Sequence, residues 1–274
     1  MKIGIVAPGR PIDRLIADRA AAATALWFPG TDLVFHPQCF ESDGGHFAGT
    51  DEVRSAAFLD FANDAAFDAL WFARGGYGAN RILHRVIPNL SAAAKTKSWC
   101  GYSDAGFLLG ALYAAKIGHP VHAPLVSDIA RVGGDVSFAR TLAWLTGRDR
   151  GVLEPSLGRQ PAVAFNLSIL NALIGTGWLP DLTGHVLMIE EISEPLYRVD
   201  RMLFQMAHAT ALKGLVGVRL GRVSDVIPND PPFVGGAQQM IERWCGEMGV
   251  PYLGPADIGH DSDNKVVPFG SIGF

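Results

Sequence analysis

The sequence predicts an α/β fold in which an N-terminal domain with a parallel sheet precedes a smaller C-terminal α/β domain. Over residues 2–122, short apolar segments alternate with longer segments of helical periodicity. This alternation is typical of a parallel sheet whose two faces are covered by helices. A stretch rich in Gly and Pro, from Gly147 to Pro161, interrupts the pattern, and a second alternation follows it. At 274 residues the chain is long enough for two modest domains.

Turn and cap signals bound the elements of the N-terminal half. The apolar run Lys2–Ala7 ends at Pro8, and Pro11 suits the first turn of a helix. Thr50 can cap the helix that follows it. The expected strands cover residues 2–7, 32–36, 68–73, 98–102 and 120–122. The expected helices cover residues 11–25, 51–66, 80–86, 104–116 and 134–146.

The C-terminal half continues the alternation with fewer elements. The expected helices cover residues 166–175, 198–212 and 236–248, and the expected strands cover residues 185–190, 215–223 and a tail strand from residue 251. The sequence therefore predicts a flavodoxin- or Rossmann-like domain over residues 1–147, a linker over 148–165 and a C-terminal α/β domain over 166–274. Sites in parallel sheets form beyond the carboxyl ends of the strands, so the loops there should open onto one rim.

Composition limits the class of partner and the compartment. The net charge is −4 and the pI is near 6.0, which argues against nucleic acid or an anionic membrane as the main partner. Three widely spaced cysteines predict free, buried thiols in a reducing compartment. Pro8 breaks the N-terminal apolar run too early for a signal peptide, and no apolar run approaches the ~20 residues that span a bilayer. We therefore expect a cytoplasmic protein.

Ser103 lies at the joint between a predicted buried strand and a predicted helix. A serine on such a turn can hold its hydroxyl out at the carboxyl end of a parallel sheet. The amide of Asp104 would point to the same place from a helix N-terminus, where an oxyanion is favoured. The usual Gly-x-Ser-x-Gly pattern is incomplete, because Ala105 stands where the second glycine belongs. A plain helix cap is the alternative interpretation.

The glycine-rich loop Arg74–Gly78, which follows a predicted strand, has three interpretations. Its amides could cradle a phosphate, although it lacks the Lys-Ser/Thr pair of a P-loop. Gly75 or Gly76 could supply an oxyanion-hole amide, because glycine lets the backbone approach a substrate closely. The third interpretation is a tight turn.

Two glutamates and one histidine are further candidates for chemistry. Glu190 and Glu191 end an apolar strand, and a buried carboxylate there needs a partner such as a histidine. They point to opposite faces if the strand persists, so only one can serve; exposed glutamates are the alternative. His260, in a polar loop, could be a base or a surface side chain. The ligand spacing of a metal site is absent, and we predict neither a metal nor another cofactor.

Seven stretches taken together resemble the LD-carboxypeptidases of serine peptidase family S66, and they occur in the family's order. The matching stretches are Val6–Pro8, Arg74–Arg81, Gly101–Asp104, His122–Pro124, Asn166–Leu167 with Leu173–Thr176, Glu190–Leu203, and Gly259–His260 with Val267–Gly270. The resemblance implies an active site in the cleft between two domains. It also implies a triad of Ser103 as nucleophile, His260 as base and Glu190, rather than Glu191, as the acid.

The same resemblance implies an activity and a substrate. The oxyanion hole would combine the amide of Asp104 with one from Gly75 or Gly76. The enzyme would be a homodimer that removes the terminal D-alanine from cytoplasmic murein tetrapeptides during peptidoglycan recycling, without a metal. The sequence departs from the residues usual in this family at Gly9, Ala123 and Ala164–Phe165. These positions are expected in loops on the substrate side.

Four further side chains are candidates for binding the substrate. We name Arg74, Tyr77, Arg81 and Asn166 as candidates. An exopeptidase must recognise a free carboxylate, for which guanidinium groups are suited, and the cations considered are Arg74, Arg81, Arg198 and Arg201.

Two other functions remain open. A peptidase acting on peptidyl-nucleotide antibiotics such as microcin C would need an aromatic side chain to stack on a base, for which Trp178 is the candidate. A two-domain protein that binds a small molecule without chemistry is the alternative of another class.

Overall fold

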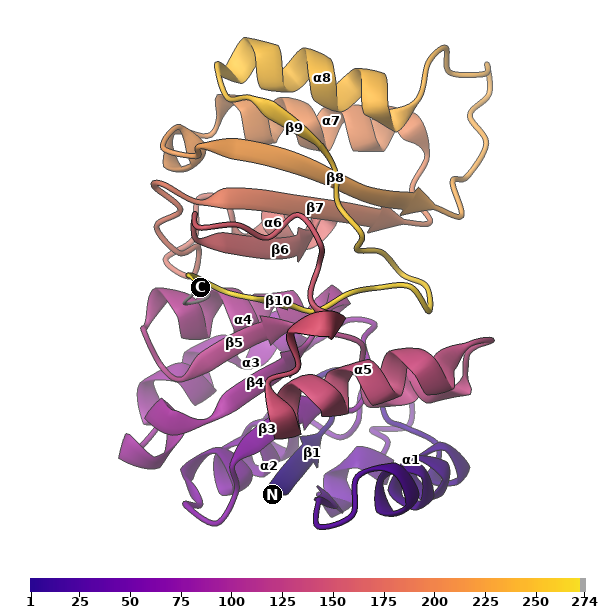
Figure 1. Cartoon of the computed structure of the whole chain (residues 1–274), viewed down its shortest axis with the longest axis vertical. Coiled ribbons are helices and arrows are strands. Elements are labelled where there is room, and N and C mark those ends of the chain that lie inside the picture. Colours follow the sequence, from indigo (N-terminus) through magenta and orange to yellow (C-terminus); the bar gives the residue numbers. More distant parts are fainter. Residues whose placement is uncertain (272–274) are drawn as a thin grey trace.

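The computed structural model describes residues 1–271 as two α/β halves stacked along the long axis (Figure 1). The first half is built on a six-stranded sheet with the order β10-β5-β4-β3-β1-β2. Its strands are β1 (Lys2–Val6), β2 (Asp32–Phe35), β3 (Ala69–Phe72), β4 (Ser98–Gly101), β5 (His119–His122) and β10 (Val267–Pro268). The first five strands are parallel, as predicted, and β10 runs antiparallel to β5.

Helices cover both faces of this sheet. They are α1 (Arg14–Trp27), α2 (Asp51–Asn63), α3 (Ala79–Val86), α4 (Gly106–Ala114) and α5 (Gly134–Gly147). Side chains alternate along β3, so Leu70 and Phe72 join the core under α2, α3 and α4, whereas Trp71 joins the core under α1 and α5. Both cores are fully buried around these strands, which fixes the carboxyl ends of the sheet in place.

The second half is a four-stranded parallel sheet with the order β6-β7-β8-β9. Its strands are β6 (Ala162–Asn166), β7 (Val186–Ile192), β8 (Gly217–Ser224) and β9 (Tyr252–Pro255), and its helices are α6 (Leu167–Leu173), α7 (Leu196–His208) and α8 (Ala237–Met248). The strand β6 lies almost wholly within the predicted linker. Asn166, expected to start a helix, is instead the last residue of β6, and its side chain caps α6 by accepting from the amide of Ile169.

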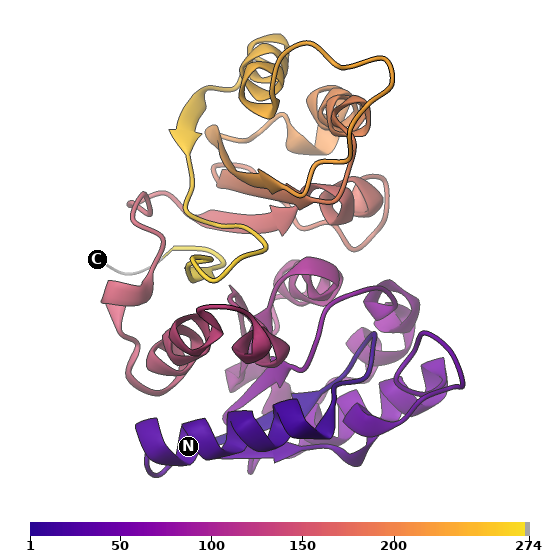
Figure 2. The ribbon, with the colours of Figure 1, turned by 90° about the vertical axis from the view of Figure 1, so that its right-hand side faces the viewer.

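The tail of the chain returns to the first half. After β9 the tail, seen in yellow in Figures 1 and 2, passes between the two halves and ends as β10 on the edge of the first sheet. The sequence did not predict this antiparallel strand. Residues 272–274, included in the predicted C-terminal domain, lie outside the described residues. The returning tail carries His260 to the boundary between the halves.

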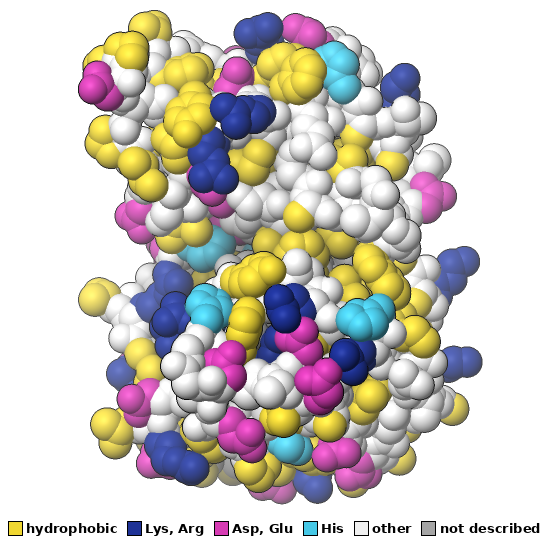
Figure 3. Space-filling view, turned by 180° about the vertical axis from the view of Figure 1, so that it is seen from behind, with side chains coloured by type: hydrophobic (Ala, Val, Ile, Leu, Met, Phe, Trp, Pro, Cys, Tyr) yellow, Lys and Arg dark blue, Asp and Glu magenta, His cyan; other side chains and the backbone are white. Residues whose placement is uncertain are grey.

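Other features of the fold bear on the predictions from composition. Cys39, Cys100 and Cys245 are free and buried, as predicted. No helix within residues 1–271 is both long and apolar enough to cross a membrane. The space-filling view shows a notch between the two halves at its left edge, with Lys or Arg and His side chains around it (Figure 3).

Candidate active site

Ser103 lies two residues after the end of β4, at the start of the turn that leads into α4. Its backbone φ is +59°, in the left-handed region that residues other than glycine rarely occupy. Gly101 makes the turn possible, because a β-carbon there would lie 2.7 Å from the ring of Phe72. Backbone strain of this kind is concentrated at functional sites, where the surrounding structure holds it in place. The turn therefore presents the Ser103 hydroxyl at the rim, where it lines a pocket.

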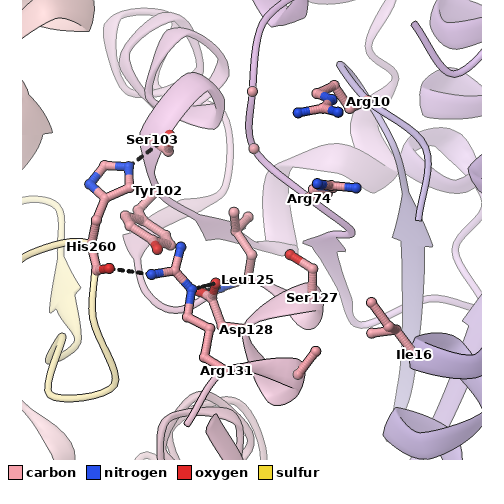
Figure 4. A pocket seen from close by; sticks show the side chains of 13 residues that line it. Arg10, Ile16, Arg74, Tyr102, Ser103, Leu125, Ser127, Asp128, Arg131 and His260 are labelled. Atoms are coloured by element: carbon pink, nitrogen blue, oxygen red, sulfur yellow. Dashed lines mark hydrogen bonds and ion pairs between the residues drawn. The ribbon is translucent and has the colours of Figure 1, made fainter. Parts of the chain in front are cut away.

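His260 connects Ser103 to Glu190. Its Nε2 lies 3.0 Å from Ser103 Oγ, and its Nδ1 lies 2.6 Å from Glu190 Oε2. Figure 4 shows the contact between His260 and Ser103 at one side of the pocket, with the two residues coming from different halves of the chain. When Nδ1 carries the proton, it donates a hydrogen bond to Glu190, and Nε2 is free to accept a hydrogen bond from the Ser103 hydroxyl. The arrangement can thus draw a proton from Ser103.

Burial and charge shift the ionisation of this pair. Burial of the His260 imidazole favours its neutral form, but the charge and hydrogen bond of Glu190 outweigh burial and raise the pKa of His260. Glu190 is fully buried, and burial raises its own pKa against the opposing effect of His260. The buried carboxylate of Glu190 therefore stabilises the protonated imidazole of His260. A solvent-exposed carboxylate would have a much smaller effect, because water would screen its charge.

Glu191 points to the other face of β7 and performs a different task. It accepts hydrogen bonds from the Asn166 side chain at 2.8 Å, the Ser168 amide at 2.8 Å and the Ser168 hydroxyl at 2.6 Å. These contacts hold the start of α6. Of the two glutamates, only Glu190 contacts His260 among the described residues.

Three arginines hold the loop that carries His260, and the sequence did not identify them. Arg131 donates to the His260 carbonyl oxygen. Arg140 donates to the carbonyl oxygens of Ser262, at 3.0 Å, and Asn264, at 2.7 Å. Arg222 pairs with the side chains of Asp257 and Asp261. No spacing in the sequence links these positions, because the contacts form only when distant segments fold together.

The glycine-rich loop lies against the nucleophile turn. A β-carbon on Gly75 would lie 3.1 Å from Ser103 Oγ, so the backbone of this loop directly adjoins the hydroxyl. Asp104 fastens the loop, since its Oδ2 accepts the Ala79 amide at 2.9 Å. Burial raises the pKa of Asp104 to about 6, against the backbone amides that lower it. Gly75 and Gly76 thus border the pocket beside Ser103.

A pocket of about 350 Å³ opens in front of Ser103 and His260. Arg10, Arg74 and Arg131 contribute to its lining, and Figure 4 shows Arg10 and Arg74 on the side opposite His260. Arg74 is the one substrate-binding candidate named from the sequence that lines the pocket. Arg10 and Arg131 were not named, although the loop of Arg10 follows the first strand.

The other substrate-binding candidates have partners outside this pocket. Arg81 pairs with Asp51 at 2.9 Å, and Tyr77 packs near Phe47. Asn166 binds Glu191, as described above. The two α7 arginines considered for binding the substrate carboxylate also lie outside this pocket. Arg198 pairs with Glu194, and Arg201 lies over the ring of Tyr197.

Two family models match the chain. The model described as the LD-carboxypeptidase N-terminal domain covers residues 3–123, and the one described as the LD-carboxypeptidase C-terminal domain covers residues 161–272. A Bacillus subtilis protein named "Probable murein peptide carboxypeptidase" is 27% identical over 98% of this chain and 86% of its own length. The "Murein tetrapeptide carboxypeptidase" of Pseudomonas aeruginosa is 25% identical over 82% of this chain and 78% of its own length.

Solved structures share the fold. The muramoyltetrapeptide carboxypeptidase from Oxalobacter formigenes superposes with a TM-score of 0.79 at 23% identity, covering 98% of this chain and 93% of that one. MccF in complex with glutamyl sulfamoyl guanosine gives the same TM-score at 16% identity, covering 99% of this chain and 96% of that one. The two family models cover most of both halves and include Ser103, Glu190 and His260, so the protein is a member of the LD-carboxypeptidase family of peptidases.

Proposed function

We propose that the protein is a serine carboxypeptidase that hydrolyses the bond between an L-configured centre and the terminal D-alanine of a murein tetrapeptide. The observation that carries the proposal is the His260 imidazole, within hydrogen-bond reach of both Ser103 and Glu190 at the wall of an arginine-lined pocket. The names of the curated relatives support the class of substrate.

The proposed mechanism runs through an acyl-enzyme. His260 Nε2 takes the proton of Ser103 as Oγ attacks the scissile carbonyl, and the carbonyl oxygen becomes an oxyanion facing the amides of Asp104 and of Gly75 or Gly76. His260 then gives that proton to the departing amine, so free D-alanine leaves with an intact amino group. A water molecule, deprotonated by the same imidazole, attacks the ester and regenerates Ser103. Glu190 fixes the imidazole tautomer throughout.

The setting of the reaction is part of the same proposal. The family resemblance supports a homodimer in the cytoplasm acting during peptidoglycan recycling. Analytical ultracentrifugation of the full chain tests the dimer, and fractionation of the source cells tests the compartment.

Incubation with disaccharide tetrapeptide is the direct test. We expect mass spectrometry to detect the loss of one alanine, at the same rate with and without EDTA, because the proposed steps use only side chains and backbone amides. Release of a larger fragment, or no release, would contradict the proposal.

Peptidyl-nucleotide antibiotics are the rival substrate, and the shared fold with MccF is the observation in its favour. Trp178, the aromatic candidate for base stacking, packs partly buried against the hydrophobic core and does not line the pocket. We therefore favour the murein peptide. Turnover of the tetrapeptide, compared with that of an acyl-sulfamoyl adenylate, separates the two.

Replacing Gly75 with alanine is expected to lower kcat by about 10- to 100-fold, because a displacement of the reacting groups is costly in rate. The new β-carbon would lie 3.1 Å from Ser103 Oγ and 3.3 Å from Leu125 Cδ1, which is closer than ordinary contact. Gly147→Ala is the matched control, because nothing lies within 4 Å of a β-carbon there. If both variants have the same kcat on the tetrapeptide, the loop at Gly75 does not position the reacting groups.

A further inference from the structure

Two of the three arginines that line the pocket have no acidic partner in the described part of the chain. Arg131 is paired with Asp128 at 2.9 Å. Arg74 makes one long hydrogen bond, to the Pro11 carbonyl oxygen at 3.5 Å, and Arg10 makes neither an ion pair nor a hydrogen bond within residues 1–271. Asp128, the acidic residue in the lining, is committed to Arg131 and to the Leu125 amide. The pocket thus presents an uncompensated positive charge.

The two unpartnered guanidinium groups also act on each other. Burial lowers the pKa of Arg74, and the nearby charge of Arg10 lowers it further. Like charges brought together without an acid raise the free energy of the empty site, and an anion between them relieves the repulsion. Such a pair on a pocket wall is therefore suited to an anionic group of the ligand.

The backbone holds this pair close to the nucleophile. Gly76 has φ +119°, and a β-carbon on it would overlap the aliphatic part of the Arg10 side chain. Arg10 therefore crosses directly over the glycine-rich loop at Gly76. The next residue back, Gly75, adjoins Ser103, and Arg74 precedes it. Arg74 is the first residue of the loop that borders the Ser103 hydroxyl, and Arg10 lies against Gly76 of the same loop. Both cations line the pocket on the side opposite His260 (Figure 4).

We propose that Arg10 and Arg74 together bind the free carboxylate at the C-terminus of the substrate, and that this contact restricts the enzyme to terminal residues. The proposal rests on the carboxypeptidase function proposed above. In a peptide substrate only one residue separates the scissile carbonyl from the terminal carboxylate, so the carboxylate site must adjoin the nucleophile. An internal peptide bond offers a neutral amide at that position and leaves both guanidinium groups without an anion.

The test compares a tetrapeptide that ends in a free acid with the same peptide ending in an amide. We expect Arg10→Gln and Arg74→Gln each to lower kcat/KM for the acid by roughly 10- to 100-fold, mainly through KM, as the loss of a charged hydrogen bond does. Turnover of the amide should change less than threefold. Arg85→Gln is the control, because Arg85 is an exposed arginine of the same half that pairs with Glu52 away from the pocket. Circular dichroism and thermal melts establish that each variant is folded.

The outcomes separate this proposal from the function on which it rests. If the wild type cleaves the acid and the amide equally, or if both variants keep the wild-type preference, the carboxylate site is wrong although the peptidase function stands. If the wild type cleaves neither, the peptidase function fails, and calorimetry with the Ser103→Ala protein then decides the carboxylate site alone. Tighter binding of the acid than of the amide, lost in a Ser103→Ala/Arg74→Gln protein, supports the site; equal or absent binding of both overturns it.

Discussion

Replacing Ser103 with alanine is expected to lower kcat on the tetrapeptide by about four to six orders of magnitude, while binding of the peptide persists. The substitution removes only the oxygen that would form the ester, and enzymes of this mechanistic type lose that much when the nucleophile is deleted. His260 and Glu190 stay in contact, because their hydrogen bond does not involve Ser103. Single-turnover kinetics and calorimetry on the same protein measure the two quantities.

The Ser103 variant also decides between an enzyme and a protein that only binds a small molecule. Alanine keeps the β-carbon, so the strained turn with φ +59° is retained and the melting temperature should stay within a few degrees of wild type. Equal turnover by wild type and variant would assign the observed hydrolysis to another group or to a contaminant. It would leave the two-domain protein as a binding module.

The parts of the candidate site that the sequence could place come from local patterns. Ser103 and the Gly75 loop each follow a short apolar strand, and the carboxyl ends of parallel strands necessarily share a rim. The orientation of Glu190 and Glu191 follows from the two-residue period of β7. Such features need only neighbouring residues, so a single sequence contains them.

The parts that the sequence did not predict depend on contacts between distant segments. The strand β6 begins directly after the Gly- and Pro-rich stretch that ends at Pro161, and its pairing with β7 makes this short segment a strand. The two residues of β10 pair with β5 only after both halves have formed. Arg131 is recognisable as a support for the His260 loop only when their separation of 129 residues has been closed by folding.

Replacing Glu190 with glutamine is expected to lower kcat by about three to four orders of magnitude. Because an amide can donate to Nδ1 as well as accept from it, the imidazole can adopt the tautomer whose Nε2 carries the proton and cannot accept from Ser103. The variant also loses the charge that raises the pKa of His260, while the burial that lowers it remains. The acid limb of the pH profile of kcat/KM should therefore move to lower pH, since the neutral imidazole is the active form.

Glu191→Gln is the matched control for Glu190→Gln, one residue along the same strand. Glu191 accepts four hydrogen bonds, from Asn166, Ser168 and the Ile192 amide, and none from His260. An amide can keep only part of this set, so we expect a loss of about 1–3 kcal/mol in the free energy of unfolding. Because His260 keeps its partner, kcat per folded molecule should fall less than tenfold and the acid limb should stay in place.

A shifted acid limb in Glu191→Gln, with an unshifted one in Glu190→Gln, would exchange the roles of the two glutamates. The pH profile thus identifies the carboxylate that acts on the imidazole, whereas a loss of activity alone would also follow from a loosened α6.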